Sequence, residues 1–257
     1  MARLHTHSQH FLKSPAVVER FIHKLNLSEH DTVIDLGAGS GVISAAVSKE
    51  VKQVIALEIE PRTLEVLKEN MALRPNVKVL NKDILAFIPP KDGYKIVANI
   101  PFSISSAVVT RFTEEVPPAH SMHLILQRQF AHKLVPGTDH FTSLLSAKIG
   151  PWFTVRIIHQ LDKNDYTPPP AVDTVLVEIT PRKNPLIAPS EAKSYREFVT
   201  RCFERQKFFA TLPRERVGIS AELRPSQLSL SQWQQLFKTA TLGKRPTKPQ
   251  GKYRNRK

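Results

Sequence analysis

Four consecutive residues, Asn99-Ile100-Pro101-Phe102, combine the groups that can hold a flat, aminated base. The side-chain oxygen of Asn99 and the backbone carbonyl of Ile100 can each accept one hydrogen of an exocyclic amino group. The ring of Phe102 can stack on the face of the base. A strand that ends in a proline-bent turn with a core phenylalanine would have the same sequence, so these residues alone leave both interpretations open.

Polar groups also follow the three apolar runs that precede this segment. The glycine-rich loop 37–41, Glu58 and Asp83 come after the runs 32–36, 53–57 and 77–80, respectively. Helical patterns separate these runs, and such alternation predicts a mainly parallel sheet with helices on both faces. Ligands bind outside the carboxyl ends of the strands in sheets of this kind. We therefore expect the loop, both carboxylates and Asn99 at one edge of the sheet.

The glycine loop has the spacing G-x-G-x-G rather than the G-x-G-x-x-G of dinucleotide sites. Glycines let the backbone approach a ligand closely, and Glu58 can accept hydrogen bonds from both hydroxyls of a ribose. These features alone leave a nicotinamide cofactor open, because its ribose is bound by an acid in the same place. Asp83 can accept a hydrogen bond from an adenine amino group, or it can cap a turn. Together they favour a ligand with ribose and adenine but no required pyrophosphate, and S-adenosylmethionine fits.

Other patterns complete the expected fold. Apolar residues at helical spacing predict helices from Pro15 to Leu25, from Pro61 to Met71 and around Tyr195–Phe203, and further strands are expected at 123–126, 153–158 and 174–179. Three consecutive prolines, 168–170, predict a stiff loop that holds Tyr166 in place. Ser229 and Gln232 form the pattern of a capping box for a last helix.

Positive charge is concentrated in the last third of the chain, whose total net charge is +14. Residues 1–181 contain 19 Lys and Arg against 18 Asp and Glu, whereas residues 182–257 contain 18 against 5. This asymmetry predicts a polyanionic partner, and a nucleic acid rather than an anionic membrane, since no strongly apolar amphipathic helix accompanies it; a tail that only aids solubility would have the same composition. The shift in composition predicts a main domain at 1–181, a small helical domain at 182–242, and a basic tail at 243–257 that is disordered without its partner; the family resemblance described below implies that the first is catalytic and the second binds RNA. The candidate nucleic-acid-binding residues of the tail are Lys244, Arg245, Lys248, Lys252, Arg254, Arg256 and Lys257.

Several classes of protein are excluded by composition. No stretch approaches the ~20 apolar residues of a membrane span, and residues 1–10 lack the apolar centre of a secretory signal. The one cysteine, Cys202, excludes an internal disulfide framework and a multi-cysteine zinc site. We expect a cytoplasmic monomer without a metal site or a membrane partner.

Six segments together resemble the rRNA adenine N6-methyltransferase superfamily, which contains the Erm macrolide-resistance enzymes and the KsgA-type dimethyltransferases. They are SQHFL at 8–12, DLGAGSG at 35–41, ALEIE at 56–60, DILAF at 83–87, NIPF at 99–102 and YTPPPAVD at 166–173. They occur in family order within residues 8–205. The resemblance implies an α/β fold, namely a Rossmann-like class I S-adenosylmethionine-dependent methyltransferase sheet with a small α-helical C-terminal domain.

The resemblance also implies roles for individual residues. Cofactor binding would fall to Gln9, Phe11, Gly37, Gly39, Gly41, Glu58, Asp83, Ile84 and Asn99. The target amino group would lie beside Asn99 and the Ile100 carbonyl, with Phe102 completing the catalytic set. Phe102 and Tyr166 would surround the target base, and Tyr166 stands where Phe is common in the family.

Within the superfamily the chain resembles the Erm branch more than the KsgA branch. Ser8-Gln9, the NIPF segment followed by Ser103-Ile104-Ser105-Ser106, residues 127–133 and the basic tail all favour Erm. This implies methylation of N6 of an adenine in the peptidyl-transferase loop of 23S rRNA and resistance to macrolides, lincosamides and streptogramin B. The alternatives are a KsgA-type 16S rRNA dimethyltransferase and a non-catalytic RNA-binding relative. A DNA adenine methyltransferase is disfavoured because its motif usually has Pro where this chain has Ile100.

Overall fold

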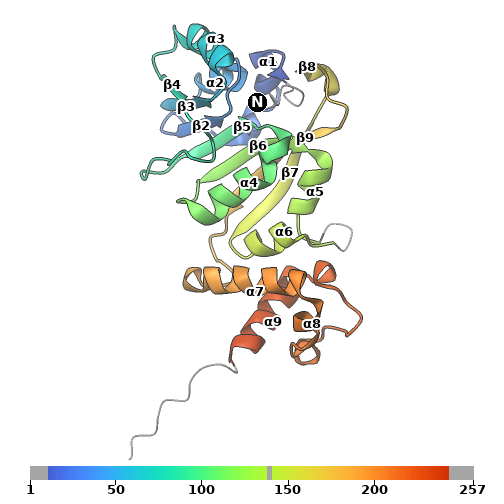
Figure 1. Ribbon diagram of the computed structural model, residues 1–257. Helices are drawn as coiled ribbons and strands as arrows, with labels where there is room; N and C mark the ends of the chain where they lie inside the picture. The colour runs from blue at the N-terminus through green and yellow to red at the C-terminus, as the bar shows by residue number, and fades with distance from the viewer. Residues whose placement is uncertain (1–10, 138–140, 243–257) are drawn as a thin grey trace, which may run out of the picture.

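The computed structural model describes residues 11–137 and 141–242 (Figure 1). Its strands are β1 (Phe11–Leu12), β2 (Thr32–Leu36), β3 (Gln53–Glu58), β4 (Val77–Asn81), β5 (Lys95–Asn99), β6 (Ser121–Gln127), β7 (Phe153–Leu161), β8 (Tyr166–Thr167) and β9 (Thr174–Pro181). Its α-helices are α1 (Pro15–Glu19), α2 (Val42–Val47), α3 (Pro61–Met71), α4 (Ser105–Thr110), α5 (Arg128–Leu134), α6 (Leu144–Ile149), α7 (Ala192–Glu204), α8 (Gln206–Ala210) and α9 (Leu230–Leu242).

Seven strands form one sheet in the order β4-β3-β2-β5-β6-β9-β7. The pairs β2–β3, β3–β4, β2–β5 and β5–β6 are parallel, whereas β9 runs antiparallel to both of its neighbours. The chain reverses direction in sheet order after β4, so β5 returns to the other side of β2. In such sheets the crevice at this reversal is where ligands bind.

Helices cover both faces of the sheet, as the alternating pattern predicts (Figure 1). Alternate residues of each strand point to opposite faces, so Ile34 and Ile96 pack toward α4, α5 and α6. Val33 and Val97 pack toward α1 and α2 on the other face. Strands buried on both sides explain why the sequence shows apolar runs rather than alternation.

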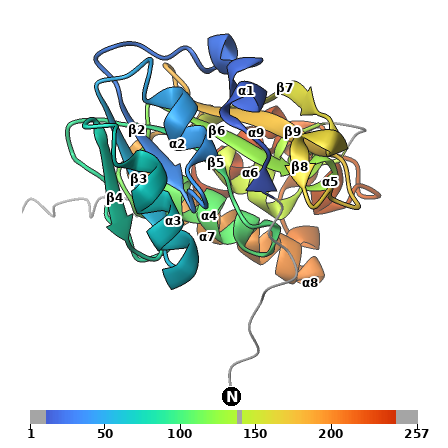
Figure 2. The ribbon, with the colours of Figure 1, turned by 90° about the horizontal axis from the view of Figure 1, so that it is seen from above.

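Two short strands lie outside the main sheet, side by side in the view from above (Figure 2). β1 pairs antiparallel with β8, so that Phe11 lies opposite Thr167 and Leu12 opposite Tyr166. A 2.5 Å ion pair between Arg20 and Asp165 joins the same two segments. The N-terminal segment is therefore fastened to the start of the proline-rich loop.

The helical C-terminal part packs directly on the sheet domain, with α7 below α6 in Figure 1. Tyr195 of α7 contacts Trp152 edge-on, with 5.5 Å between ring centroids, and its hydroxyl donates to the Ala147 carbonyl at 3.2 Å. Both aromatic residues belong to one hydrophobic core that also contains Trp233 of α9. The two parts on either side of the boundary expected near residue 181 therefore share one hydrophobic core.

Most of the expected elements form within one to three residues of their predicted ends. The exception is the helix expected from Pro15 to Leu25: α1 ends at Glu19, and Ile22–Leu25 continue as a 3-10 helix. Phe21, with φ of −124°, bends the chain between the two pieces. The capping box is confirmed, because Ser229 N–H donates to Gln232 Oε1 at 2.9 Å and Gln232 N–H donates to Ser229 Oγ at 3.3 Å. In the described part of the chain no helix is both long and apolar enough to cross a bilayer.

Candidate active site

A single cleft lies at the carboxyl ends of β2, β3 and β5, where the polar groups were expected. It contains about 910 Å³ of empty space, including its open mouth. Of the predicted residues, its wall contains Phe11, Gly37, Gly39, Glu58, Asp83, Ile84, Asn99, Ile100 and Phe102. Residues separated by more than 90 positions in the sequence therefore meet in one place.

Glu58 is 5% exposed, and its carboxylate is held by three backbone N–H groups. Oε2 accepts from Gly39 at 2.9 Å, while Oε1 accepts from Ile59 at 2.8 Å and from Glu60 at 2.9 Å. A carboxylate can accept about four hydrogen bonds, so Oε2 can still accept one from a ligand hydroxyl. Glu58 can thus hold one ribose hydroxyl without giving up its backbone contacts.

The loop after β2 brings bare backbone to the cleft. Gly39 has φ of +58°, and a methyl group built on it would lie 3.0 Å from the ring of Phe11. Phe11 of β1 therefore covers the loop closely and forms one wall of the cleft. A side chain at position 39 would press against the Phe11 ring, so the close approach of the loop to Phe11 favours glycine at this position.

The next part of the wall has the chemistry for a purine. Asp83 is exposed, and its Oδ1 already accepts from the Leu85 N–H at 2.8 Å, which leaves Oδ2 for a ligand. Ile84 is buried in the wall, whereas Ile59, directly after Glu58, is 59% exposed on it. Two aliphatic side chains beside a carboxylate acceptor fit the faces and the amino edge of adenine. Sequence reasoning missed Ile59, although an isoleucine next to a ribose-binding acid was the available signal.

The Asn99–Phe102 segment forms the other end of the cleft. Asn99 is the last residue of β5 and is half-buried, Ile100 is 1% exposed, and Pro101 has no N–H that could compete for the cleft. Phe102 begins a 3-10 helix, Phe102–Ile104, and is half-buried at the cleft wall. The Asn99 amide, the Ile100 carbonyl and the Phe102 ring therefore lie on one wall of the cleft, which is the arrangement needed to bind an aminated base.

Asp35 is a charged residue of the wall to which sequence reasoning gave no role. It is 1% exposed, and its Oδ2 accepts from the N–H and the hydroxyl of Ser44 at 3.0 and 2.7 Å. Burial raises the pKa of Asp35 to about 7; the Ser44 hydrogen bonds oppose this shift and the nearby Glu58 adds to it. The carboxyl group thus gains or loses a proton near neutral pH.

Gly41 does not lie on the cleft wall, although it was expected along the cofactor. It has φ of +90°, and a methyl group built on it would lie 2.8 Å from both Leu67 Cδ1 and Met71 Cε of α3. Gly41 is therefore required for the close packing of the loop against α3. Its place in the glycine motif has a structural reason rather than a ligand.

Tyr166 is also placed differently from the expectation that it flanks the target base. Its side chain is 0% exposed in the core between the sheet and α1, and its hydroxyl lies 2.7 Å from Thr174 Oγ1. A ring without exposed surface cannot stack on a base, so of the two residues predicted to flank the base only Phe102 offers that surface. Tyr166 thus faces the core, where it lies opposite Leu12 and contacts Thr174.

Two groups of predicted residues lie outside the described residues. These are Gln9 in the N-terminal segment and the seven cations of the tail, Lys244, Arg245, Lys248, Lys252, Arg254, Arg256 and Lys257.

The sequence is similar to ribosomal RNA methyltransferases. The family model described as ribosomal RNA adenine dimethylase matches residues 3–212. A relative named ribosomal RNA small subunit methyltransferase A, from Sulfurihydrogenibium sp. (strain YO3AOP1), is 27% identical and covers 89% of this chain and 93% of its own length. The rRNA adenine N-6-methyltransferase of Bacillus anthracis is 26% identical and covers 91% of this chain and 85% of its own length.

The fold is similar to that of a solved enzyme over nearly the whole chain. The crystal structure of the 23S rRNA methyltransferase ErmE matches with a TM-score of 0.77 and 26% sequence identity. It covers 90% of this chain and 99% of its own. The similarity therefore includes the sheet and the helical C-terminal part.

Proposed function

Because the chain belongs to the ribosomal RNA adenine dimethylase family, we propose that its cleft methylates N6 of one adenine in the peptidyl-transferase loop of 23S rRNA. The chain is an S-adenosylmethionine-dependent rRNA (adenine-N6)-methyltransferase. The observation that carries the residue assignments is the cleft itself, which brings Glu58, Asp83 and Asn99 together from three strand ends. We further propose that the target lies in the rRNA of the larger ribosomal subunit. Its methylation would confer resistance to macrolides, lincosamides and streptogramin B.

The cofactor fits one half of the cleft. Glu58 Oε2 accepts from the ribose, Asp83 and the backbone at Ile84 hold the adenine edge, and the loop from Gly37 to Gly39 lies along the aminoacyl part. Phe11 packs against Gly39 and forms the wall of this half of the cleft. When bound, S-adenosylmethionine supplies a methyl group activated on a sulfonium.

The target adenine occupies the other half. Adenine N6 is a poor nucleophile because its lone pair is delocalised into the ring. Asn99 Oδ1 and the Ile100 carbonyl accept its two hydrogens, which draws the nitrogen toward tetrahedral geometry and localises the pair. Phe102 replaces part of the stacking that the base loses on leaving the RNA helix, about 1–3 kcal/mol.

Positioning then supplies most of the rate enhancement. The chain needs no general base while the methyl group moves, because the methylated nitrogen is acidic enough to give its proton to water. This agrees with the cleft wall, whose described residues contain acids, amide and carbonyl groups but no histidine or cysteine.

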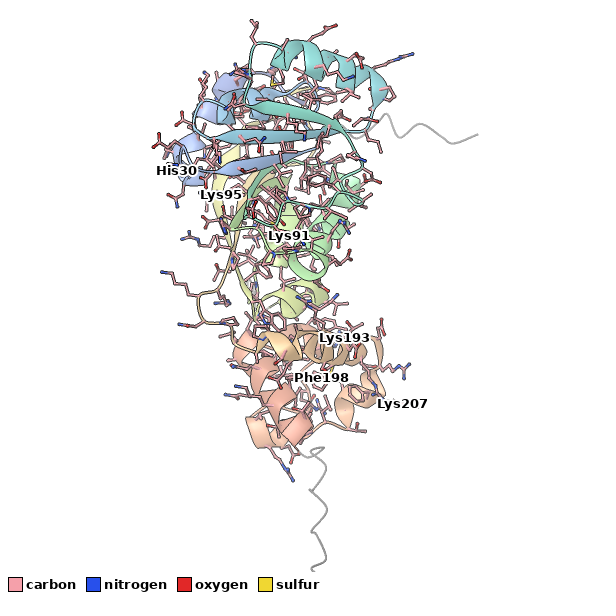
Figure 3. The ribbon with its side chains drawn as sticks, turned by 90° about the vertical axis from the view of Figure 1, so that its left-hand side faces the viewer. His30, Lys91, Lys95, Lys193, Phe198 and Lys207 are labelled. Carbon is pink, nitrogen blue, oxygen red and sulfur yellow. The ribbon has the colours of Figure 1, made fainter. Side chains whose placement is uncertain are left out.

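RNA binding is assigned to the C-terminal third. Residues 182–242 contain 11 Lys and Arg against 5 Asp and Glu, and Figure 3 shows Lys193 and Lys207 on the helical part, at the end of the molecule remote from His30. The basic tail at 243–257 adds seven cations to this end. Separate cationic and catalytic parts agree with a large polyanionic substrate.

A second candidate is a 16S rRNA dimethyltransferase of ribosome biogenesis, favoured by the matching relative named small subunit methyltransferase A. The features that support the 23S target instead are the ErmE-like fold over 90% of the chain and the NIPF segment. A non-catalytic RNA-binding relative is disfavoured because the acceptor groups that methyl transfer requires, at Glu58, Asp83, Asn99 and Ile100, are all present in the cleft.

Transfer of a labelled methyl group to purified ribosomal particles tests these alternatives. The proposal expects label in 23S rRNA, mapped by primer extension to one adenine, together with macrolide resistance in cells that express the protein. Label in 16S rRNA would establish the second candidate. An absence of label in all RNAs, with S-adenosylmethionine still bound, would establish the non-catalytic alternative.

A further inference from the structure

A second hollow lies beside the cleft, and we call it the β6 groove. It runs between the start of α5 and the 163–173 loop and is lined by Gln127, Arg128, His132, Lys163, Val172 and Asp173. Asn99 pairs in register with Ile125, two residues before Gln127. With ~4.8 Å between strands and ~3.3 Å per residue, the Cα atoms of Asn99 and Gln127 lie about 8 Å apart. The groove therefore begins next to the catalytic end of the cleft.

Backbone contacts hold both walls of the groove in place. The Arg128 N–H donates to the Asp173 carbonyl at 2.9 Å, and Gln127 lies opposite Thr174 in the β6–β9 pair. On the loop side, Lys163 Nζ donates to the Ala171 carbonyl at 3.2 Å. The two cations of the groove thus start from fixed positions on opposite walls.

One carboxylate lies between these two cations. Asp173 is 4.0 Å from Arg128 Nη1 through Oδ2 and 3.2 Å from Lys163 Nζ through Oδ1. The side chains are 47% exposed for Asp173 and Lys163 and 52% for Arg128, so both cations also face solvent. Two cations and one acid leave a net positive charge. Exposed pairs of this kind contribute only about 0–1 kcal/mol, so the two cations can exchange Asp173 for the anion of a ligand at little cost.

We propose that the β6 groove binds the backbone phosphate next to the target adenosine, with Arg128 and Lys163 as its ligands. This inference rests on the proposed function, because it requires an RNA strand whose base enters the cleft. A base turned out of its stack leaves its flanking phosphates at the mouth of the pocket. Guanidinium and ammonium groups are the common protein ligands for such phosphates. Val172, 42% exposed, offers an apolar surface to the adjoining sugar.

The test uses Arg128→Gln and Lys163→Gln, each with a matched control. Arg156→Gln removes a 70% exposed arginine that pairs with Glu178, and Lys49→Gln removes a 52% exposed lysine that pairs with Glu19. Neither control residue lines the cleft or the groove. The probes are two forms of an rRNA stem-loop that carries the adenine: the natural RNA, and one with neutral methylphosphonates on both sides of that adenosine.

We expect each groove variant to weaken binding of the natural RNA about tenfold and to reduce the slope of log K against log salt by about 0.7. On the methylphosphonate RNA the same variants should bind as wild type does, because the contact is already absent. The controls should match wild type on both RNAs, and all proteins should bind S-adenosylmethionine equally.

Equal losses on both RNAs, or equal losses in the controls, would overturn the phosphate assignment. These binding measurements do not depend on methylation. A wild-type protein that binds the RNA but methylates no rRNA would contradict the proposed function, while the comparison of the two RNAs would still decide the role of the groove.

Discussion

The backbone N–H of Gly39 donates to the carboxylate of Glu58 at 2.9 Å, which joins the glycine loop after β2 to the end of β3. The two residues that the sequence suggests as separate contacts to a cofactor are thus also bonded to each other. The carboxylate shapes the loop before any ligand arrives. Changing Glu58 should therefore affect the protein with and without cofactor.

We expect Glu58→Gln to weaken S-adenosylmethionine binding by about 1.5–3 kcal/mol, the range for a hydrogen bond to a charged group. The variant should also unfold at a lower temperature, because an amide nitrogen faces one of the backbone donors. Isothermal titration calorimetry and thermal melting measure the two effects. Glu65→Gln, on the exposed side of α3, is the control. Unchanged affinity in Glu58→Gln would exclude Glu58 from the cofactor site.

Asn99→Ala should lower kcat about 10²–10³-fold, the usual effect of removing one acceptor or donor that acts in the transition state. Affinity for S-adenosylmethionine should change little, because Glu58, Asp83 and the backbone at Ile84 remain. Single-turnover methylation and equilibrium dialysis separate the two quantities. Parallel loss of both would mean that Asn99 serves mainly to bind the cofactor.

Gly41→Ala should destabilise the protein by about 1–3 kcal/mol, because the new methyl group overlaps Leu67 and Met71. Gly137→Ala is the matched control: it also has positive φ, but no atom lies within 4 Å of its added methyl group. Urea unfolding of both variants separates the overlap from backbone strain. Equal destabilisation of the two would refute a packing role for Gly41.

Stability without cofactor should depend on pH through Asp35. Its pKa is about 7 in the folded protein and 3.8 as the reference value. Between these values the unfolded chain releases the proton while the folded chain keeps it, so stability is full below about pH 4 and falls up to about pH 7. At 1.36 kcal/mol per pKa unit the fall is about 4 kcal/mol.

Asp35→Asn removes this ionisation and should be more stable, relative to wild type, at pH 8 than at pH 5. Urea unfolding at both pH values measures the difference. A difference that does not change with pH would show that Asp35 ionises normally in the folded protein.

Removal of residues 243–257 should weaken RNA binding and flatten its dependence on salt, because fewer counterions are released. Filter binding of an rRNA fragment between 50 and 200 mM salt measures the slope. Methylation of the same fragment at saturating RNA should persist. An unchanged slope would show that the tail does not contact RNA.

The sheet and the cleft were predictable because their signals are local. Each apolar run ends at a polar residue, and parallel strands place these ends together, so Glu58, Asp83 and Asn99 could be assigned to one site. What the sequence could not show depends on contacts between distant segments. Tyr166 is buried because β8 pairs with β1, some 150 residues earlier in the chain.

The glycine motif illustrates the same limit. Gly39 and Gly41 look equivalent in the sequence, but only packing decides that Gly39 faces Phe11 at the cleft while Gly41 faces α3. The perturbed pKa of Asp35 likewise needs burial, which no spacing reveals. The β6 groove joins residues 127–132 to residues 163–173; both segments take part in the family resemblance, but nothing in the sequence shows that they lie side by side.

The edge-on contact between Trp152 and Tyr195 has a consequence for how the molecule unfolds. The sheet part and the helical part share one hydrophobic core. Unfolding of the helical part would expose Trp152, and unfolding of the sheet part would expose Tyr195. Heat or denaturant should therefore melt both in a single cooperative transition rather than in two. The helical part therefore cannot be removed or exchanged without exposing the core that it shares with the sheet.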